Sequence, residues 1–261
     1  MRQKLSLAAV LLAVAPATVP AYAAEPTPKE QIQSDISTRE ISIQSNFTGI
    51  EILIFGSVDF SQTPAPDEGG YDVITVIRTP GEPMVARRKE RVAGIWVNGA
   101  AMTFSSIPGF YAVLSTRPLR AITSEATLKS LGIGLGNLDF VRHSKSDLDE
   151  ETFRSAVIRL KEKQGLFQEI DDGVSFIGRS LFRASVDLPV NVPIGRYTAD
   201  VYLFRDGTLA SKNQSTLEVT QVGFERLLYL LAFRYPFIYG LFGVVVAVLA
   251  GLFGWAVFRR E

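Results

Sequence analysis

Phe237–Phe258, with the sequence FIYGLFGVVVAVLAGLFGWAVF, is an uncharged stretch of 22 residues close to the end of the chain. A helix of this length is roughly 33 Å long, which is enough to cross a hydrocarbon core of about 30 Å. Because lipid offers no hydrogen-bond partners, an uninterrupted helix is the conformation that satisfies this backbone. We therefore predict a transmembrane helix at residues 236–258, followed by a cytoplasmic tail at 259–261.

Residues 1–23 have the pattern of a secretory signal peptide. Two basic residues precede a short apolar segment, and Ala21-Tyr22-Ala23 matches a signal peptidase site. The pattern predicts cleavage after Ala23, with Ala24 as the first residue of the mature chain. A retained signal anchor is the alternative, but the apolar segment is too short to span a membrane well. Signal and later span together predict a single-pass type I protein.

Composition restricts the class of protein. Acidic and basic side chains number 27 each, and loss of the signal leaves a formal charge of −2, which argues against nucleic acid as a partner. The chain has no cysteine and one histidine, His143, so we expect no metal site, no cofactor and no enzyme activity. An exported chain without cysteine fits a bacterial periplasm better than a eukaryotic cell surface. We expect an inner-membrane protein with its bulk in the periplasm.

Short apolar runs separated by turn residues predict a mainly β protein between the signal and the span. Tyr71–Arg78 is rich in β-branched residues, and Leu181–Leu188 alternates apolar and polar side chains. About 200 residues suit one large or two small domains. We expect two Ig-like, β-sandwich-type modules with one intervening helix, in this order: a linker at 24–35, module 1 at 36–142, a connecting helix at 143–165, module 2 at 166–222 and a juxtamembrane helix at 223–235.

Turn residues give more local expectations. Tyr111 and Tyr197 each follow a turn that contains Pro and Gly, and each begins a strand. At such corners of Greek-key sandwiches the tyrosine hydroxyl often binds upstream backbone. The repetition favours two related modules, and coincidental turn chemistry explains it equally well. Asn98-Gly99 is the strongest two-residue hairpin signal in the chain, so we expect a turn there.

Leu148–Gln164 has the pattern of an amphipathic helix. Ser146 or Asp147 can cap its start, and Gly165 can end it. Its apolar stripe has the spacing i, i+3, i+4, i+7 and consists of Phe153, Ala156, Val157 and Leu160. This stripe should pack on a sheet or in a groove between the modules.

The densest basic run of the chain is Arg87-Arg88-Lys89-Glu90-Arg91. On a strand, Arg87, Lys89 and Arg91 would share one face. That face is a candidate contact for an anion, for lipid headgroups or for an acidic partner. The alternative is a solvated edge strand that its charges protect from aggregation.

In the predicted membrane helix, Gly243, Ala247 and Gly251 repeat at a spacing of four. Small residues at this spacing permit the close approach of a second helix, so they are a candidate interaction face within the bilayer. Because small residues are common in membrane helices, the spacing is also compatible with a helix that has no such partner.

Arg87–Asn98 (RRKERVAGIWVN), followed by Pro108-Gly109-Phe110-Tyr111, resembles an uncharacterised alphaproteobacterial family of transmembrane proteins. The resemblance covers about residues 36–260 and implies an inner-membrane protein with a periplasmic part. Genes of that family often lie near sulfite-exporter-like permeases, which implies a link to transport but assigns no functional residue.

Two functions follow as hypotheses. The first is a periplasmic interaction module that is accessory to a transporter or envelope complex, with the bilayer and another inner-membrane protein such as a permease as partners. The second is a membrane-tethered binding protein for a small anion, with the Arg/Lys run as its cradle.

Overall fold

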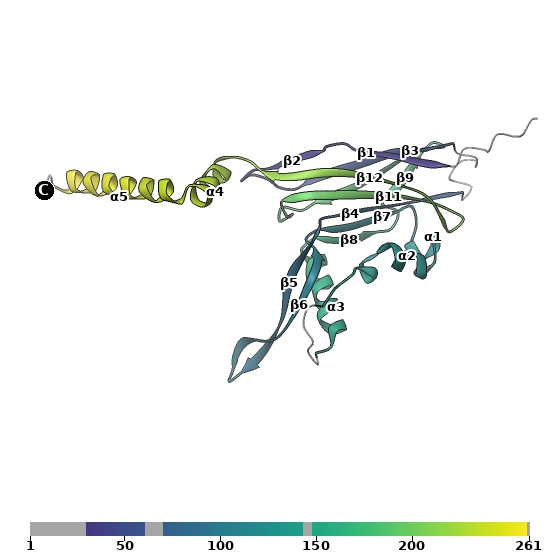
Figure 1. Ribbon diagram of the computed structural model, residues 1–261, viewed down its shortest axis with the longest axis horizontal. Helices are drawn as coiled ribbons and strands as arrows, with labels where there is room; N and C mark the ends of the chain where they lie inside the picture. The colour runs from purple at the N-terminus through teal and green to yellow at the C-terminus, as the bar shows by residue number, and fades with distance from the viewer. Residues whose placement is uncertain (1–29, 61–69, 143–147, 260–261) are drawn as a thin grey trace, which may run out of the picture.

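The computed structural model describes residues 30–60, 70–142 and 148–259 (Figure 1). The predicted signal peptide, with Ala23 and Ala24, lies outside the described residues, and so do residues 24–29 of the predicted linker and His143. The second half of that linker is described, and it belongs to the strand β1 (Gln31–Ile36), because Ile32 and Ile36 are buried in the core. The described part is mainly β and ends in a long apolar helix, which confirms the predicted fold class.

Two sheets pack face to face. The first has the order β1-β3-β10-β9 and is antiparallel throughout. Its strands are β1 (Gln31–Ile36), β3 (Ile50–Asp59), β10 (Leu181–Leu188) and β9 (Val174–Ile177). The second has the order β2-β12-β11-β4-β7-β8, with parallel pairs at its two ends. Its strands are β2 (Glu40–Ile43), β12 (Thr208–Gln221), β11 (Gly195–Arg205), β4 (Tyr71–Arg78), β7 (Tyr111–Ser115) and β8 (Phe167–Ile170).

Strands from both predicted modules are neighbours in both sheets. β3 pairs with β10, and β4 pairs with β11, so strands that precede and follow the connecting helix share their hydrogen bonds. The described strands therefore form one sandwich, which corrects the expectation of two modules. The physical reason is that a period-two pattern specifies which face of a strand is buried, but it does not specify which strand lies beside it.

The core follows the predicted alternation. β10 buries Phe182, Ala184, Val186 and Leu188 and leaves Arg183 and Asp187 exposed. β4 is buried along almost its whole length, on both faces, because it is a central strand of the six-stranded sheet. Two short helices that the sequence analysis did not predict, α1 (Leu119–Ile122) and α2 (Glu125–Leu131), lie on the side of that sheet away from β1 and β3 (Figure 1).

The two corner tyrosines differ in their partners. The Tyr197 hydroxyl donates to the Pro193 carbonyl oxygen at 2.5 Å, which confirms the expected bond to upstream backbone. The Tyr111 hydroxyl donates to the Gly132 carbonyl oxygen at 3.1 Å and accepts from the Gly134 N–H at 3.0 Å. Tyr111 therefore fixes the downstream segment after α2, and the two corners are not repeats of one structure.

A long hairpin leaves the sandwich and consists of β5 (Gly81–Val92) and β6 (Ile95–Pro108) (Figure 1). Its turn is Ala93-Gly94, where both residues have positive φ (49° and 84°), as a two-residue hairpin turn of this kind requires. The expected turn at Asn98-Gly99 is therefore wrong, because both residues lie within β6. Gly99 leaves room for the carboxylate of Glu90, since an added Cβ would lie 2.3 Å from its carboxyl carbon and the Glu90 side chain would have to move.

The connecting helix is α3 (Glu150–Lys163), slightly shorter than predicted. Its N-cap is Asp149, whose carboxylate accepts from the Glu151 N–H at 3.3 Å and from the Thr152 hydroxyl. Ser146 and Asp147, the two caps that the sequence suggested, lie outside the described residues. α3 lies beside the base of the hairpin (Figure 1).

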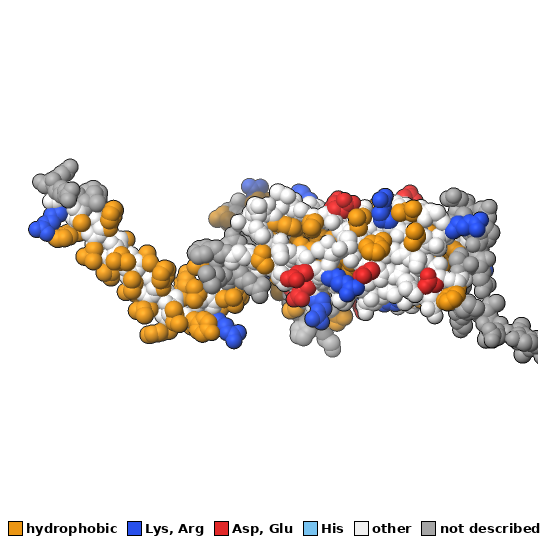
Figure 2. Space-filling model, turned by 90° about the horizontal axis from the view of Figure 1, so that it is seen from above, with side chains coloured by type: hydrophobic (Ala, Val, Ile, Leu, Met, Phe, Trp, Pro, Cys, Tyr) orange, Lys and Arg blue, Asp and Glu red, His pale blue; other side chains and the backbone are white. Residues whose placement is uncertain are grey.

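The chain ends in two helices, α4 (Phe224–Arg234) and α5 (Pro236–Phe258). Residues Pro236–Ala256 have a mean hydropathy of 2.3 and are the single stretch of the described residues that is long and apolar enough to span a membrane. Figure 2 shows hydrophobic side chains along the whole length of this helix, in contrast to the mixed surface of the sandwich. The helix bounds agree with those predicted from the sequence.

Candidate functional site

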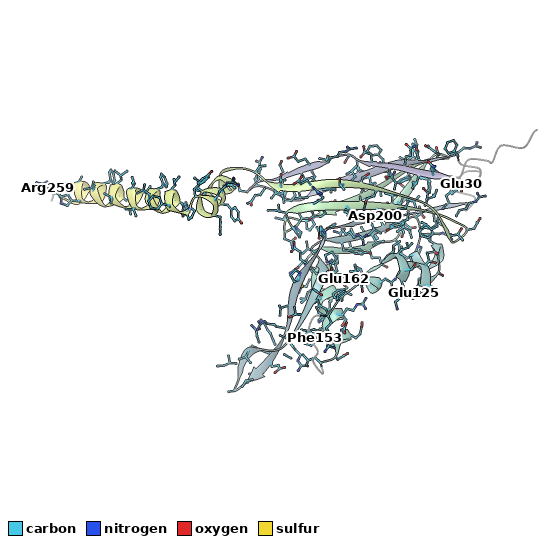
Figure 3. The ribbon with its side chains drawn as sticks, in the orientation of Figure 1. Glu30, Glu125, Phe153, Glu162, Asp200 and Arg259 are labelled. Atoms are coloured by element: carbon cyan, nitrogen blue, oxygen red, sulfur yellow. The ribbon has the colours of Figure 1, made fainter. Side chains whose placement is uncertain are left out.

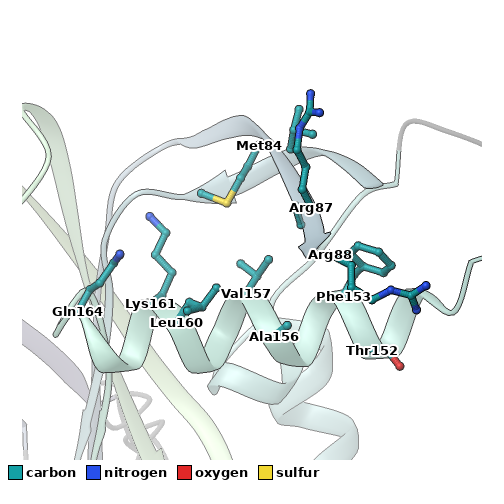
Figure 4. A pocket seen from close by; sticks show the side chains of 12 residues that line it. Met84, Arg87, Arg88, Thr152, Phe153, Ala156, Val157, Leu160, Lys161 and Gln164 are labelled. Atoms are coloured by element: carbon teal, nitrogen blue, oxygen red, sulfur yellow. The ribbon is translucent and has the colours of Figure 1, made fainter. Parts of the chain in front are cut away.

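A groove of about 310 Å³ lies between β5 and α3 (Figure 4). Its lining is mainly apolar and combines one strand with one helix. The lining residues are Met84, Val85, Ala86, Arg87 and Arg88 from β5, and Thr152, Phe153, Ala156, Val157, Leu160, Lys161 and Gln164 from α3.

The predicted apolar stripe of α3 is divided between the core and this groove. Phe153 and Val157 are buried, whereas Leu160 is 56% exposed and Ala156 is half-buried. Figure 4 shows Phe153 on the side of α3 that faces the hairpin. Half of the stripe thus remains available for contact with another molecule.

The strand that forms the other wall has a free edge. In the described part of the chain, β5 pairs with β6 alone, along one side. Its second edge therefore presents unpaired backbone groups beside the groove, and Val85 on this strand is 51% exposed. An unpaired edge next to an apolar groove is a known arrangement for binding extended peptides.

Positive side chains lie at both ends of the groove. Figure 4 shows Arg88 extending toward Thr152 at one end and Lys161 at the other. Arg88 is partly neutralised, because its guanidinium binds the Glu90 carboxylate at 2.8 Å. Lys161 donates from Nζ to the Gly109 carbonyl oxygen at 3.2 Å.

The pKa values of these charged groups are shifted by their surroundings. Burial lowers the pKa of Lys161, and the nearby carboxylate of Glu82 opposes that shift. The hydrogen bond from Arg88 holds the pKa of Glu90 below its usual value, and the Ala100 backbone adds to this effect. The positive groups at the ends of the groove thus both have partners within the chain, Arg88 the Glu90 carboxylate and Lys161 the Gly109 carbonyl oxygen.

The predicted basic residues occupy different places on the hairpin. Arg87 lines the groove, but Figure 4 shows its side chain directed away from α3. Lys89 and Arg91 are exposed further along β5, toward the turn, and do not line the groove. The structure therefore does not gather the three residues into one anion-binding pocket.

The small residues of α5 are uncovered in the described chain. A Cβ added at Gly243 or Gly251 would meet no atom within 4 Å, so this face has room for a second helix. Ala247 lies between them on the same helix, and the span Pro236–Ala256 is not buried by any other part of the described chain.

Sequence reasoning identified the stripe of α3 but missed Met84, Val85 and Ala86 as its counterparts. These residues follow the Pro80-Gly81 turn, and their composition carries no sign of a binding surface. The signal that could have found them is the free edge of β5, which becomes visible only when the strand order is known.

Fold and groove together define a membrane-anchored β-sandwich protein with an exposed apolar groove. The family model described as "Putative transmembrane protein (Alph_Pro_TM)" matches residues 31–260, so the chain belongs to this alphaproteobacterial transmembrane family. No curated protein sequence matches the chain.

One solved structure with similarity is AggA, the major subunit of aggregative adherence fimbriae type I from Escherichia coli. The identity is 10% and the TM-score is 0.27, over 76% of this chain and 98% of that chain.

Proposed function

We propose that this membrane protein binds an extended segment of a partner protein in the groove between β5 and α3. In this role it is an accessory subunit of a transporter or envelope complex, held in a bacterial inner membrane by α5 with its sandwich in the periplasm. The observation that carries the proposal is the free edge of β5 directly beside an apolar groove.

The free edge supports a strand as the occupant. A partner strand that adds to β5 would lie about 4.8 Å from it and would continue the hairpin sheet over α3. One face of that strand would cover Ala156 and Leu160, which are now accessible. Backbone hydrogen bonds would supply affinity, and the side chains that reach α3 would supply specificity.

The same geometry defines the chemistry of the partner segment. Its groove-facing side chains should be apolar, since the lining is mainly apolar. Acidic side chains at the ends of the segment would lie near Arg88 and Lys161. A segment of another inner-membrane protein, such as a loop of a permease, satisfies these conditions.

Binding of a small anion receives less support from the structure. A small anion needs several convergent donors, but Arg87 is directed away, Arg88 is paired with Glu90, and Lys161 Nζ donates to the Gly109 carbonyl oxygen.

Site-specific photo-crosslinking in native membranes tests the proposal. A photoreactive amino acid is placed in the full chain at Leu160, which lines the groove, or at the matched position Arg159, which is exposed on α3 outside it. We expect a discrete adduct with one membrane protein from position 160 and none from position 159.

A second variant makes the result specific. Ala156→Glu places a charge within the groove and should abolish the adduct formed from position 160, whereas Ser155→Glu, on the exposed side of the helix, should not. Equal adducts from positions 159 and 160, or an adduct that survives Ala156→Glu, would refute binding in the groove.

A further inference from the structure

The tip of the β5–β6 hairpin carries more exposed apolar surface than a solvated turn needs. Ile95 and Trp96 are 68% and 66% exposed, and Val92 and Val97 are also exposed. These four residues flank the turn and lie beyond the groove, whose lining ends at Arg88. A projecting cluster of this kind is typical of a surface that contacts another phase or molecule.

Register divides the tip into two faces. Arg91 lies opposite Trp96, and Val92 lies opposite Ile95. The two residues of a pair share one face of the hairpin, and the next pair lies on the other face. One face thus carries Trp96 with the basic side chains of Arg91 and Lys89. The other carries the apolar side chains of Val92, Ile95 and Val97.

The place of the tip in the molecule indicates what it meets. α5 extends toward one end of the long axis, inclined to it in Figure 2, and the hairpin leaves the sandwich obliquely toward the same end of the molecule in Figure 1. Its tip thereby comes to about the same position along that axis as α4. α4 exposes Tyr229, Leu230 and Phe233, as a helix at a membrane surface does. A membrane crossed by α5 would therefore have its surface close to both α4 and the hairpin tip.

We propose that the hairpin tip is a second membrane contact, which inserts Val92, Ile95 and Trp96 among the anionic headgroups of the leaflet at which α5 begins. Tryptophan is favoured at the headgroup level, because its ring is apolar and its N–H can reach water. Arg87, Lys89 and Arg91 lie just behind the tip, where phosphate groups are within reach of long basic side chains. Held at two points, the sandwich has a fixed orientation on the membrane.

Lipid quenching of tryptophan fluorescence tests this contact in the full chain. The chain has two tryptophans, so Trp255→Phe leaves Trp96 as the single emitter. The variant is reconstituted into nanodiscs of phosphatidylglycerol or phosphatidylcholine, each with and without lipid brominated on the upper acyl chain. In phosphatidylglycerol nanodiscs we expect Trp96 to emit at a shorter wavelength than a tryptophan peptide in buffer without detergent. We also expect its emission to lose intensity when the lipid is brominated.

Two controls complete the design. Trp96→Phe leaves Trp255, which lies in the span and should be quenched in both lipids, so it reports incorporation. The triple variant Arg87→Gln, Lys89→Gln, Arg91→Gln should reduce the quenching of Trp96 in phosphatidylglycerol to the smaller value expected in phosphatidylcholine, as should high salt.

The proposal would be overturned if brominated phosphatidylglycerol did not quench Trp96 in the Trp255→Phe variant but did quench Trp255 in the Trp96→Phe variant. A shift of Trp96 emission that requires an added protein, without lipid quenching, would overturn it as well and would assign the tip to a protein partner. Quenching that is equal in the two lipids would overturn the part assigned to the basic residues.

Discussion

Removal of the Asp200 carboxylate should destabilise the sandwich more than any other single charge change. Asp200 lies on the central strand β11 inside the sandwich, is 0% exposed, and is labelled in Figure 3. Its carboxylate accepts hydrogen bonds from Arg78 Nη2 at 3.0 Å and from Gln214 Nε2 at 2.9 Å, and Lys212 Nζ lies at 3.0 Å. Three donors thus converge on one buried group.

The expected magnitude follows from the exposure of the partners. Loss of one member of a fully buried ion pair costs about 3–5 kcal/mol, because the other charge is left without a partner or water. Here the side chains of Arg78 and Lys212 are 39% and 42% exposed, so water can replace the lost carboxylate. We therefore expect Asp200→Ala to lower the free energy of unfolding by about 2–3 kcal/mol, below that range. Asp200→Asn should lower it by about 1–2 kcal/mol, because it keeps one acceptor oxygen.

The assay is guanidinium unfolding of the full chain in mild detergent, followed by far-ultraviolet circular dichroism. Tryptophan emission is unsuitable, because Trp96 lies at the hairpin tip and Trp255 lies in α5. Arg39→Gln is the control, since it breaks the exposed pair of Arg39 with Asp35 and should leave the transition unchanged. The reasoning is refuted if Asp200→Ala and Arg39→Gln unfold at the same denaturant concentration.

Three further predictions concern the core tyrosines, a strand glycine and the membrane helix. Burial raises the pKa of Tyr111 and Tyr197 above the usual value of 10.0, so their contribution to stability is complete below about pH 10 and is lost as the pH rises through the raised values. The free energy of unfolding should therefore fall above pH 10 in a pH titration, and Tyr197→Phe should reduce that fall. Gly56→Ala places a methyl group 2.1 Å from a backbone oxygen of β1, so unfolding by the same assay should show a loss of about 1–3 kcal/mol; an unchanged midpoint would contradict the close approach. If the small-residue face of α5 mediates helix association, the double variant Gly243→Leu, Gly251→Leu should abolish fluorescence resonance energy transfer between labelled α5 and its labelled partner helix in a bilayer. Unchanged transfer would exclude that face.

The fold class and the anchor could be predicted from the sequence because each depends on local periodicity. Tyr71–Arg78 and Leu181–Leu188 form the strands that their patterns indicate, and the uncharged stretch forms α5. Strand order could not be predicted, because β3 and β10 are more than a hundred residues apart and nothing local encodes their pairing. The same limitation led to the expectation of two modules.

The hairpin shows that the register of a long strand pair can differ from the one that a local turn signal indicates. Asn98-Gly99 has the stronger two-residue pattern, yet the chain turns at Ala93-Gly94. The register places Lys89 opposite Asn98 and shifts between Arg87 and Lys89, so the extra residue on β6 is absorbed as a bulge. For the site, sequence reasoning found the α3 side of the groove and Arg87, and it missed the apolar residues of β5, because an apolar stripe does not specify its neighbour.

The direct passage from β12 into the two C-terminal helices determines how mechanical force enters the sandwich. β12 is paired with β11 over most of its length, and its end is held further by the parallel pairing with β2 and by the Val222 N–H, which donates to the Ile43 carbonyl oxygen at 3.0 Å. Tension between the membrane and a partner bound to the domain would pull β12 lengthwise, perpendicular to its ladder hydrogen bonds. Those bonds would then bear the load together in shear and would not open one at a time, so the tether resists traction along its own axis.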